Sequence, residues 1–280
     1  MPQLAAAGYT AQISSRGAAL RSLKHGERHL ITSWPAEGPV PYFAGTILAP
    51  WPNRVGGARY PFGGRVHQLT VSEPERGHAL HGLVSDVEWR IVELLEAEDH
   101  HAFVRLAHTI TPAAGYPFTL ALTVTHRLDE RGLTTTVAAR NEGGDAAPYG
   151  CAAHPWLLGD DLSLPASKVL TTDEVLLPRS LEDVSGSPYD FREARPLDGH
   201  VVDHAFTGLS AGEARVGGVR MTWDPAVLPW VQVCTGRQLD YEGVAVEPMT
   251  CPPDAFNSGT DVVVLEPGGE HEASWTISAA

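Results

Sequence analysis

Short segments in which apolar and polar residues alternate recur along this 280-residue chain, separated by turn signals. The segments are rich in β-branched residues at a period of two, which is typical of strands that bury one face. The clearest examples are Tyr9–Ser14, Ala102–Ile110, Thr119–Leu128, Leu133–Ala139, Leu228–Cys234 and Asp261–Leu265. Their spacing predicts antiparallel strands in an all-β sandwich or barrel, rather than units in which strands and helices alternate.

Helical periodicity is almost absent from the sequence. Only Val87–Ala97 is ambiguous, because Trp89, Ile91 and Leu94 fit both periods, and we expect this segment to be a strand. The 28 glycines and 22 prolines are spread throughout, and no linker or change in composition divides the chain. The sequence therefore predicts a single domain over residues 1–280.

Charge and composition exclude several classes of partner. The formal net charge of -14 opposes binding to a phosphate backbone, so nucleic acid is not expected as a partner. No apolar run reaches about 18 residues, and the first residues lack the pattern of a secretory signal, so no membrane association is expected. The three cysteines, Cys151, Cys234 and Cys251, are too few for a disulfide framework, and the set suits the reducing cytoplasm.

Common catalytic and cofactor motifs are missing. The sequence contains no glycine-rich phosphate loop, no H-E-x-x-H and no G-x-S-x-G. His78 and His81 are three residues apart, but no third metal ligand lies near them in the sequence. We therefore expect neither a metal nor a cofactor.

The segment Val244–Gly259 places a single carboxylate, Glu247, at the end of an apolar run. A proline-broken loop follows, and we expect Pro252–Asn257 to hold the carboxylate in place. An isolated glutamate at a strand end is ordinarily solvated, so a catalytic role for Glu247 depends on support from the rest of the chain.

Three other segments offer that support. Asn53 and Arg54 lie between a stiff Pro-Trp-Pro and two glycines, and the arginine fork suits sugar hydroxyls or carboxylates. His154 ends a run of small residues and can exchange a proton near neutral pH. Asp203 lies at the end of an apolar segment, whereas Glu73-Pro74-Glu75 is expected to be a solvated loop. Aromatic residues in or near these segments would complete a sugar pocket, and they are Trp51, Trp156, Trp230 and Phe256.

Taken in order, these segments resemble the aldose 1-epimerase, or galactose mutarotase, family over nearly the whole chain. The matching elements are Asn53-Arg54 with a downstream glycine turn, Leu80-His81-Gly82, His154-Pro155-Trp156, Asp203 with Phe206, Trp230–Gly236 around Gln232, and Glu247 with Pro252–Asn257. Each element alone is weak, whereas six in the family's order are a strong signal. Two positions depart from the family pattern: Leu83 replaces a second glycine, and Trp156 replaces a tyrosine or phenylalanine.

The resemblance implies a large antiparallel β-sandwich, the supersandwich of galactose mutarotase, with its site on a concave sheet. It implies that Glu247 is the general base and His154 the general acid in the interconversion of sugar anomers, such as those of glucose or galactose. It also implies that Arg54, His81 and Asp203 bind substrate, with Asn53, Gln232 and Trp156 as further candidates. The expected partner is a small sugar, and the expected assembly is a monomer or homodimer in the cytoplasm.

Two other functions fit the same fold. A hexose-6-phosphate 1-epimerase needs additional cationic side chains at the pocket rim, for which Arg54, Arg59 and Arg65 are available. A non-catalytic carbohydrate-binding protein needs no acid and base, so the presence of both Glu247 and His154 disfavours that function. A glycoside hydrolase or a polysaccharide lyase is less favoured, because no second carboxylate is clearly paired with Glu247.

Overall fold

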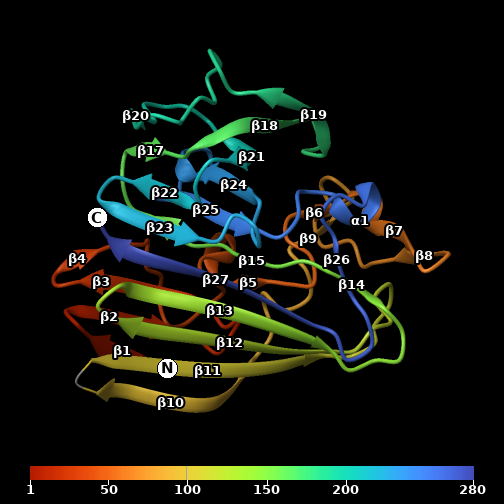
Figure 1. Ribbon diagram of the computed structural model, residues 1–280, viewed down its shortest axis with the longest axis horizontal. Coiled ribbons are helices and arrows are strands. Elements are labelled where there is room, and N and C mark those ends of the chain that lie inside the picture. The colour runs from red at the N-terminus through yellow and green to blue at the C-terminus, as the bar shows by residue number, and fades with distance from the viewer. Residues whose placement is uncertain (99) are drawn as a thin grey trace.

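The computed structural model describes residues 1–98 and 100–280, which form antiparallel sheets with almost no helix (Figure 1). Within these residues the larger sheet has nine strands in the order β10-β11-β12-β13-β27-β23-β22-β17-β20. The bounds of these strands, in chain order, are β10 Arg90–Glu98, β11 His101–Ile110, β12 Leu120–Asp129, β13 Gly132–Asn141, β17 Asp161–Ser163, β20 Arg195–Pro196, β22 Glu213–Val216, β23 Val219–Trp223 and β27 Glu270–Ala279.

A second large sheet in the described part of the chain has eight strands, seven of them in the order β19-β18-β21-β24-β25-β15-β5, with β16 pairing with β25 beside this path. The bounds of its strands are β5 Ile47–Leu48, β15 Ala152–Ala153, β16 Trp156–Leu157, β18 Ala166–Thr172, β19 Pro178–Asp183, β21 Asp203–Leu209, β24 Trp230–Thr235 and β25 Val244–Met249.

Smaller elements complete the described structure. A four-stranded sheet of β1 Gln3–Ala6, β2 Tyr9–Ile13, β3 Leu20–His25 and β4 Arg28–His29 contacts the larger sheet at β10, β11 and β12. The two-stranded sheets pair β6 Arg54–Val55 with β9 Ala79–Leu80, β7 Arg59–Phe62 with β8 Arg65–Gln68, and β14 Ala147–Tyr149 with β26 Val263–Leu265. The short helices are η1 Pro41–Phe43, η2 Gly56–Ala58, η3 Gly236–Leu239 and α1 Ala255–Ser258.

The alternating sequence pattern produces the packing of the two large sheets. In β12, burial alternates with nearly every residue, and Val124 faces the core while its neighbours do not. Val137 of β13 joins the same core cluster as Val231 of β24 and Val246 of β25, which come from the other large sheet. Because alternate residues of a strand point to opposite faces, Gln232 and Glu247 lie on the face that points away from this core.

The predicted all-β sandwich is confirmed, and the predicted strand segments all contain strands. The ambiguous segment Val87–Ala97 forms β10 from Arg90 onward and pairs antiparallel with β11. No helix among the described residues is long and apolar enough to cross a membrane.

His126 is a buried polar residue on the core face of β12. Its Nδ1 accepts a hydrogen bond from the Thr135 hydroxyl at 2.9 Å, and its Nε2 donates to the carbonyl oxygen of Ala18 at 2.9 Å. Burial lowers the pKa of His126 to about 4, against the partial opposing effect of the Ala18 carbonyl. A neutral imidazole is therefore built into the core.

We expect the free energy of unfolding to fall as the pH drops from 6.5 toward 4. In this window the unfolded chain protonates His126 while the folded chain resists it, so the unfolded state binds more protons. The contribution of His126 to the loss is on the order of 2 kcal/mol at pH 5. We would measure urea unfolding of wild type and His126→Gln at pH 7 and pH 5, and the free energy of unfolding should change less between the two pH values in the variant. An equal change in the two proteins would contradict the role of His126 in the pH dependence. His29→Gln, at an exposed histidine, serves as control.

Candidate functional site

A cavity of about 450 Å³ lies on the face of the eight-stranded sheet that points away from the core. β21, β24 and β25 contribute Asp203, Gln232 and Glu247 to its lining, and short strands, short helices and loops contribute most of the rest. All eight residues that the sequence predicts for the site line this cavity: Asn53, Arg54, His81, His154, Trp156, Asp203, Gln232 and Glu247. Residues from the first quarter to the last eighth of the chain thus meet in one place.

Glu247 and His154 are in direct contact inside the cavity. Glu247 belongs to β25, in which all six residues are buried, and His154 lies between β15 and β16. The Oε1 atom of Glu247 is 3.3 Å from the Nε2 atom of His154. The backbone of His154 is fixed on both sides, because its N–H donates to the carbonyl of Thr46 and its carbonyl accepts from Gly45.

Burial controls the protonation of this pair. Burial raises the pKa of Glu247 well above its usual range, the charge of Asp203 raises it further, and the charge of Arg54 opposes both. Burial also lowers the pKa of His154 to about 4. Both shifts favour the uncharged forms of the two side chains over a His154–Glu247 ion pair.

Arg54 is held by a carboxylate that the sequence did not mark. Its Nε and Nη2 atoms donate to the two oxygens of Glu73 at 2.8 and 2.9 Å, and Arg76 donates to the same carboxylate at 2.8 Å. Burial alone would raise the pKa of Glu73, but the bonds from the two arginines lower it overall. The prediction of a solvated Glu73 is therefore wrong: the side chain is 8% exposed and pairs with a guanidinium that is 10% exposed.

The loop Pro252–Asn257 holds the Arg54 segment rather than the carboxylate of Glu247. Asp254 accepts a hydrogen bond from the N–H of Gly56 at 2.7 Å, and its own N–H donates to the carbonyl of Arg54 at 2.7 Å. Asn257 in turn donates to the Asp254 carboxylate at 2.7 Å. The expectation that this loop directly fixes Glu247 is thus corrected: it ties two distant segments of the chain together beside the cavity.

Asp203 and Gln232 form a second polar pair on the floor of the cavity. The Nε2 atom of Gln232 donates to the Asp203 carboxylate at 2.7 Å, which fixes the orientation of the amide. Four buried polar atoms of the cavity have no partner among the described residues: Oε1 of Gln232, Oε2 of Glu247, and the Nδ1 atoms of His81 and His154. Buried polar atoms are ordinarily bonded, so these are the atoms that a polar ligand or water would satisfy.

Asn53 and Trp156 line the cavity while much of their polar capacity is used within the protein. The Oδ1 atom of Asn53 accepts from the N–H of Arg54 at 2.9 Å and approaches Nη1 of Arg54 at 3.5 Å. Trp156 is only 1% exposed, and its indole N–H donates to the carbonyl of Tyr42 at 3.2 Å. Both residues therefore shape the wall of the cavity.

His78 is not part of this cavity. Its Nδ1 accepts from the N–H of Gly57 at 3.2 Å, so its Nε2 carries the proton and donates to the carbonyl of Val175 at 3.2 Å. Both nitrogens thus join loop segments to one another. The part of the chain that the structure describes contains no group of three or more His, Cys, Asp or Glu side chains arranged for a metal ion.

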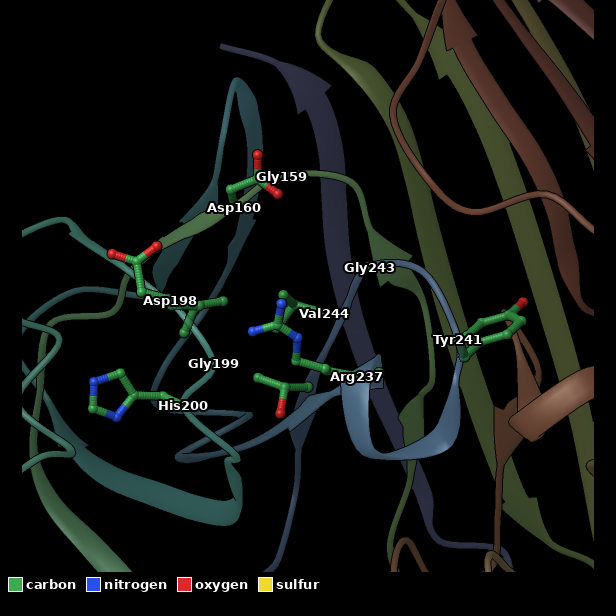
Figure 2. Close-up of a pocket in the computed structure, with 12 residues that line it drawn as sticks. Gly159, Asp160, Asp198, Gly199, His200, Arg237, Tyr241, Gly243 and Val244 are labelled. Atoms are coloured by element: carbon green, nitrogen blue, oxygen red, sulfur yellow. The ribbon is translucent and has the colours of Figure 1, made fainter.

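A second cleft of about 430 Å³, drawn in Figure 2, contains none of the predicted residues. Its lining includes Gly236 and Arg237 of η3, whereas Gln238 and Leu239 of η3 line the first cavity. Asp198, His200 and Arg237 gather along it, whereas Tyr241 lies apart from them. All eight residues that the sequence predicts for the site lie in the first cavity, which is therefore the candidate active site.

Other lining residues of the candidate active site were not predicted as site residues, and they include Tyr42, Phe43, Glu73, Arg76, Leu176, Val201, Gln238 and Leu239. No motif marks them as site residues, because their positions at the cavity depend on the path of the folded chain. Strand pairing joins some of the motif segments: β6 and β9 bring Arg54 beside Leu80, and β24 and β25 bring Gln232 opposite Glu247.

Comparison with known proteins agrees with this geometry. The family model described as aldose 1-epimerase matches residues 3–278. The uncharacterized protein YihR of Escherichia coli K12 is 36% identical over 98% of this chain and 91% of its own length. Two solved structures share the fold: a galactose mutarotase-like protein from Clostridium acetobutylicum (TM-score 0.86, 15% identity, 99% and 95% of the two chains) and a galactose 1-epimerase from Lactobacillus acidophilus (TM-score 0.83, 20% identity, 98% and 92%).

The Arg54–Glu73 pair gives a test of the site's construction. Glu73→Ala leaves a buried guanidinium without its main partner, so we expect the free energy of unfolding to fall by about 3 kcal/mol. The neighbouring Glu75 is exposed, so Glu75→Ala should change it by less than about 0.5 kcal/mol. Urea unfolding of the three proteins measures both effects, and equal stability of Glu73→Ala and wild type would refute the structural role of the pair.

Proposed function

Because this chain belongs to the aldose 1-epimerase family, we propose that it interconverts the α and β anomers of a free aldose by acid–base opening and reclosure of the ring. The observation that supports this most strongly is the buried contact of 3.3 Å between Glu247 and His154 in a cavity lined by unpartnered polar atoms. A carboxyl group and an imidazole that share one proton are what the reaction requires.

The reaction needs one proton to leave the sugar and another to arrive. Glu247 takes the proton of the C1 hydroxyl while His154 donates a proton to the ring oxygen, and the C1–O5 bond breaks. The open aldehyde rotates about C1–C2, and ring closure reverses the two proton transfers on the other face. The pair has the same number of protons before and after, so it is ready for the next turnover.

The directions of the two pKa shifts fit this cycle. Placing the single proton on His154 instead of Glu247 creates the base and the acid without adding or removing a proton. Burial disfavours that charged arrangement, as the opposite pKa shifts of Glu247 and His154 indicate. Sugar hydroxyls that donate to the Glu247 carboxylate would stabilise it, so substrate binding itself would create the active form.

The remaining polar groups suit the hydroxyls of a sugar ring. We propose that Arg54, His81, Asp203 and Gln232 contact them. The bond from Gln232 to Asp203 leaves the Gln232 Oε1 atom as an acceptor, and that atom is one of the unpartnered ones. Asn53 acts by orienting Arg54, and Trp156 by forming the wall.

The charges of the cavity favour a neutral aldose over a hexose 6-phosphate. Glu73 engages the Nε and Nη2 atoms of the Arg54 guanidinium. Arg59 and Arg65 belong to β7 and β8 and do not line the cavity. Arg76 lines it but also bonds to Glu73. Asp203, Glu73 and Glu247 would oppose a phosphate group.

We also propose that residues 1–280 form one domain. That the protein is a monomer or homodimer in the cytoplasm stays a prediction from the sequence.

Replacing Glu247 tests the base. Glu247→Gln keeps the size of the side chain but removes its basicity, so we expect the acceleration of mutarotation to fall by at least a hundredfold. Polarimetry of freshly dissolved α-glucose, α-galactose and other aldoses measures the rate, with the exposed Glu266→Gln as control. Full activity of Glu247→Gln would exclude Glu247 as the base, and a wild type that accelerates no aldose would exclude the proposed function.

Replacing His154 tests the acid. For His154→Asn we expect a large fall in kcat with a smaller change in KM, because proton donation to the ring oxygen occurs only as the C1–O5 bond breaks. Initial rates across a range of sugar concentrations separate the two constants. A change confined to KM would make His154 a substrate-binding residue instead.

A further inference from the structure

The turn that contains η1 places two consecutive aromatic residues in the left-handed region beside the cavity. Tyr42 has φ 44° and Phe43 has φ 55°, a conformation that costs on the order of 1 kcal/mol or more for a bulky residue. Local bonds hold the turn: the N–H of Ala44 donates to the carbonyl of Pro41, and that of Thr46 to the carbonyl of Phe43. The next residue, Gly45, donates to the carbonyl of His154, so the turn is fixed directly to the segment of the proposed acid.

The rings of Phe43, His81 and His154 pack together at one wall of the cavity. The centroid of the Phe43 ring is 4.5 Å from that of His81, with the two planes inclined at 61°, and 6.2 Å from that of His154. The centroids of the two imidazoles are 5.3 Å apart, and the rings are nearly perpendicular, at 82°. His81 thus packs against both Phe43 and His154.

The side chain of His81 depends on these ring contacts for its orientation. The other groups of the site are fixed by polar bonds, as Arg54 is by Glu73 and Gln232 by Asp203. No hydrogen bond among the described residues involves the imidazole of His81, and its Nδ1 is buried without a partner. The bond from the His81 N–H to the carbonyl of Asn53 fixes the backbone only. Rotation of the ring about χ2 is therefore limited by packing alone.

A hydrogen bond from an imidazole to a sugar hydroxyl weakens steeply when the ring turns out of line. We infer that Phe43 is a positioning residue, whose ring holds the imidazole of His81 in the orientation in which it meets the substrate. The inference rests on the proposed function, because it assumes that His81 binds a sugar hydroxyl. The strained turn beside the site is what brings the ring of Phe43 against His81.

The variant Phe43→Gly is suited to testing this role. Glycine adopts positive φ without strain, so removing the ring also relieves the backbone instead of distorting it. Leu176 provides a matched control, since it also lines the cavity, has φ 62°, and makes none of the ring contacts. Phe43→Tyr retains the ring and should behave like wild type.

The decisive experiment is a double-mutant cycle of Phe43→Gly and His81→Asn, followed by polarimetry with the aldose that wild type accelerates most. In the wild-type background we expect Phe43→Gly to lower kcat/KM by about ten- to a hundredfold, because a small misplacement of a binding group has effects of this size. In the His81→Asn background the same change should cost less than about threefold, because the group that Phe43 positions is already gone.

Three outcomes would overturn the inference. Equal losses in the two backgrounds would mean that Phe43 acts on the sugar directly and not through His81. No loss in the wild-type background would mean that the ring has no role. An equal loss in Leu176→Gly would mean that loosening any part of the wall has the same effect.

A second measurement separates this inference from the proposed function. The His81 ring proton gives a nuclear magnetic resonance line that His81→Asn identifies, and its titration requires no substrate. Burial lowers the pKa of His81 well below its usual range, and the charges of a protonated His154 and of Arg54 lower it further. Those charged groups, together with Glu247 and Asp203, remain in Phe43→Gly, so admission of water alone should move the titration of His81 upward in pH.

If wild type accelerates no aldose but the His81 line moves in Phe43→Gly and not in Leu176→Gly, the proposed function fails while the positioning role stands. If wild type is active and the line does not move, the positioning role fails while the function stands.

Discussion

The site depends on burying an ionisable carboxyl group in the middle of a sheet. Glu247 lies on a strand whose six residues are all buried, and it is itself 1% exposed. A charged carboxylate in such a position is costly unless it is paired, so burial sets the protonation of Glu247 and of its neighbour His154 together. A sheet can impose this environment because the cross-strand neighbours of β25, among them Gln232 opposite Glu247, are fixed by the hydrogen-bonding register.

The register of the sheet positions only part of the site, and the remaining groups come from loops that must be fixed by other means. The segment of Arg54 is held from two directions: Glu73 bonds to the side chain, and Asp254 bonds to the backbone on both sides of Val55. Asp254 follows β25 after a short loop, so the strand that delivers the proposed base also leads to the residue that fixes Arg54. The Arg54–Glu73–Arg76 cluster is therefore tied, through Asp254, to the segment that follows the strand of Glu247.

Much of this could be predicted from the sequence, and the limits have physical causes. Period-two alternation depends on local geometry, so strands such as β11, β12 and β13 were predicted within one or two residues. The eight candidate residues lie in one cavity because motif order reflects a shared fold. Glu73 and Phe43 were missed because their importance arises from contacts with Arg54 and His81, which are 19 and 38 residues away along the chain. The role of the Pro252–Asn257 loop was misjudged for the same reason, since its partner Gly56 is nearly 200 residues distant.

The two departures from the family pattern have different consequences in the folded chain. Leu83 donates its N–H to the carbonyl of Ala49 and packs against the main core, and it does not line the cavity. The family pattern has a tyrosine at this position, which would present a phenolic hydroxyl, or a phenylalanine, which has no polar group. Trp156 instead has an indole N–H, which donates to the carbonyl of Tyr42. That bond holds the left-handed turn that presents Phe43 to His81, and Tyr241 packs against both Trp156 and Tyr42. Trp156 and the strained turn are therefore parts of one arrangement, in which the indole is bonded to the turn whose Phe43 ring packs against His81, the histidine that we propose binds substrate.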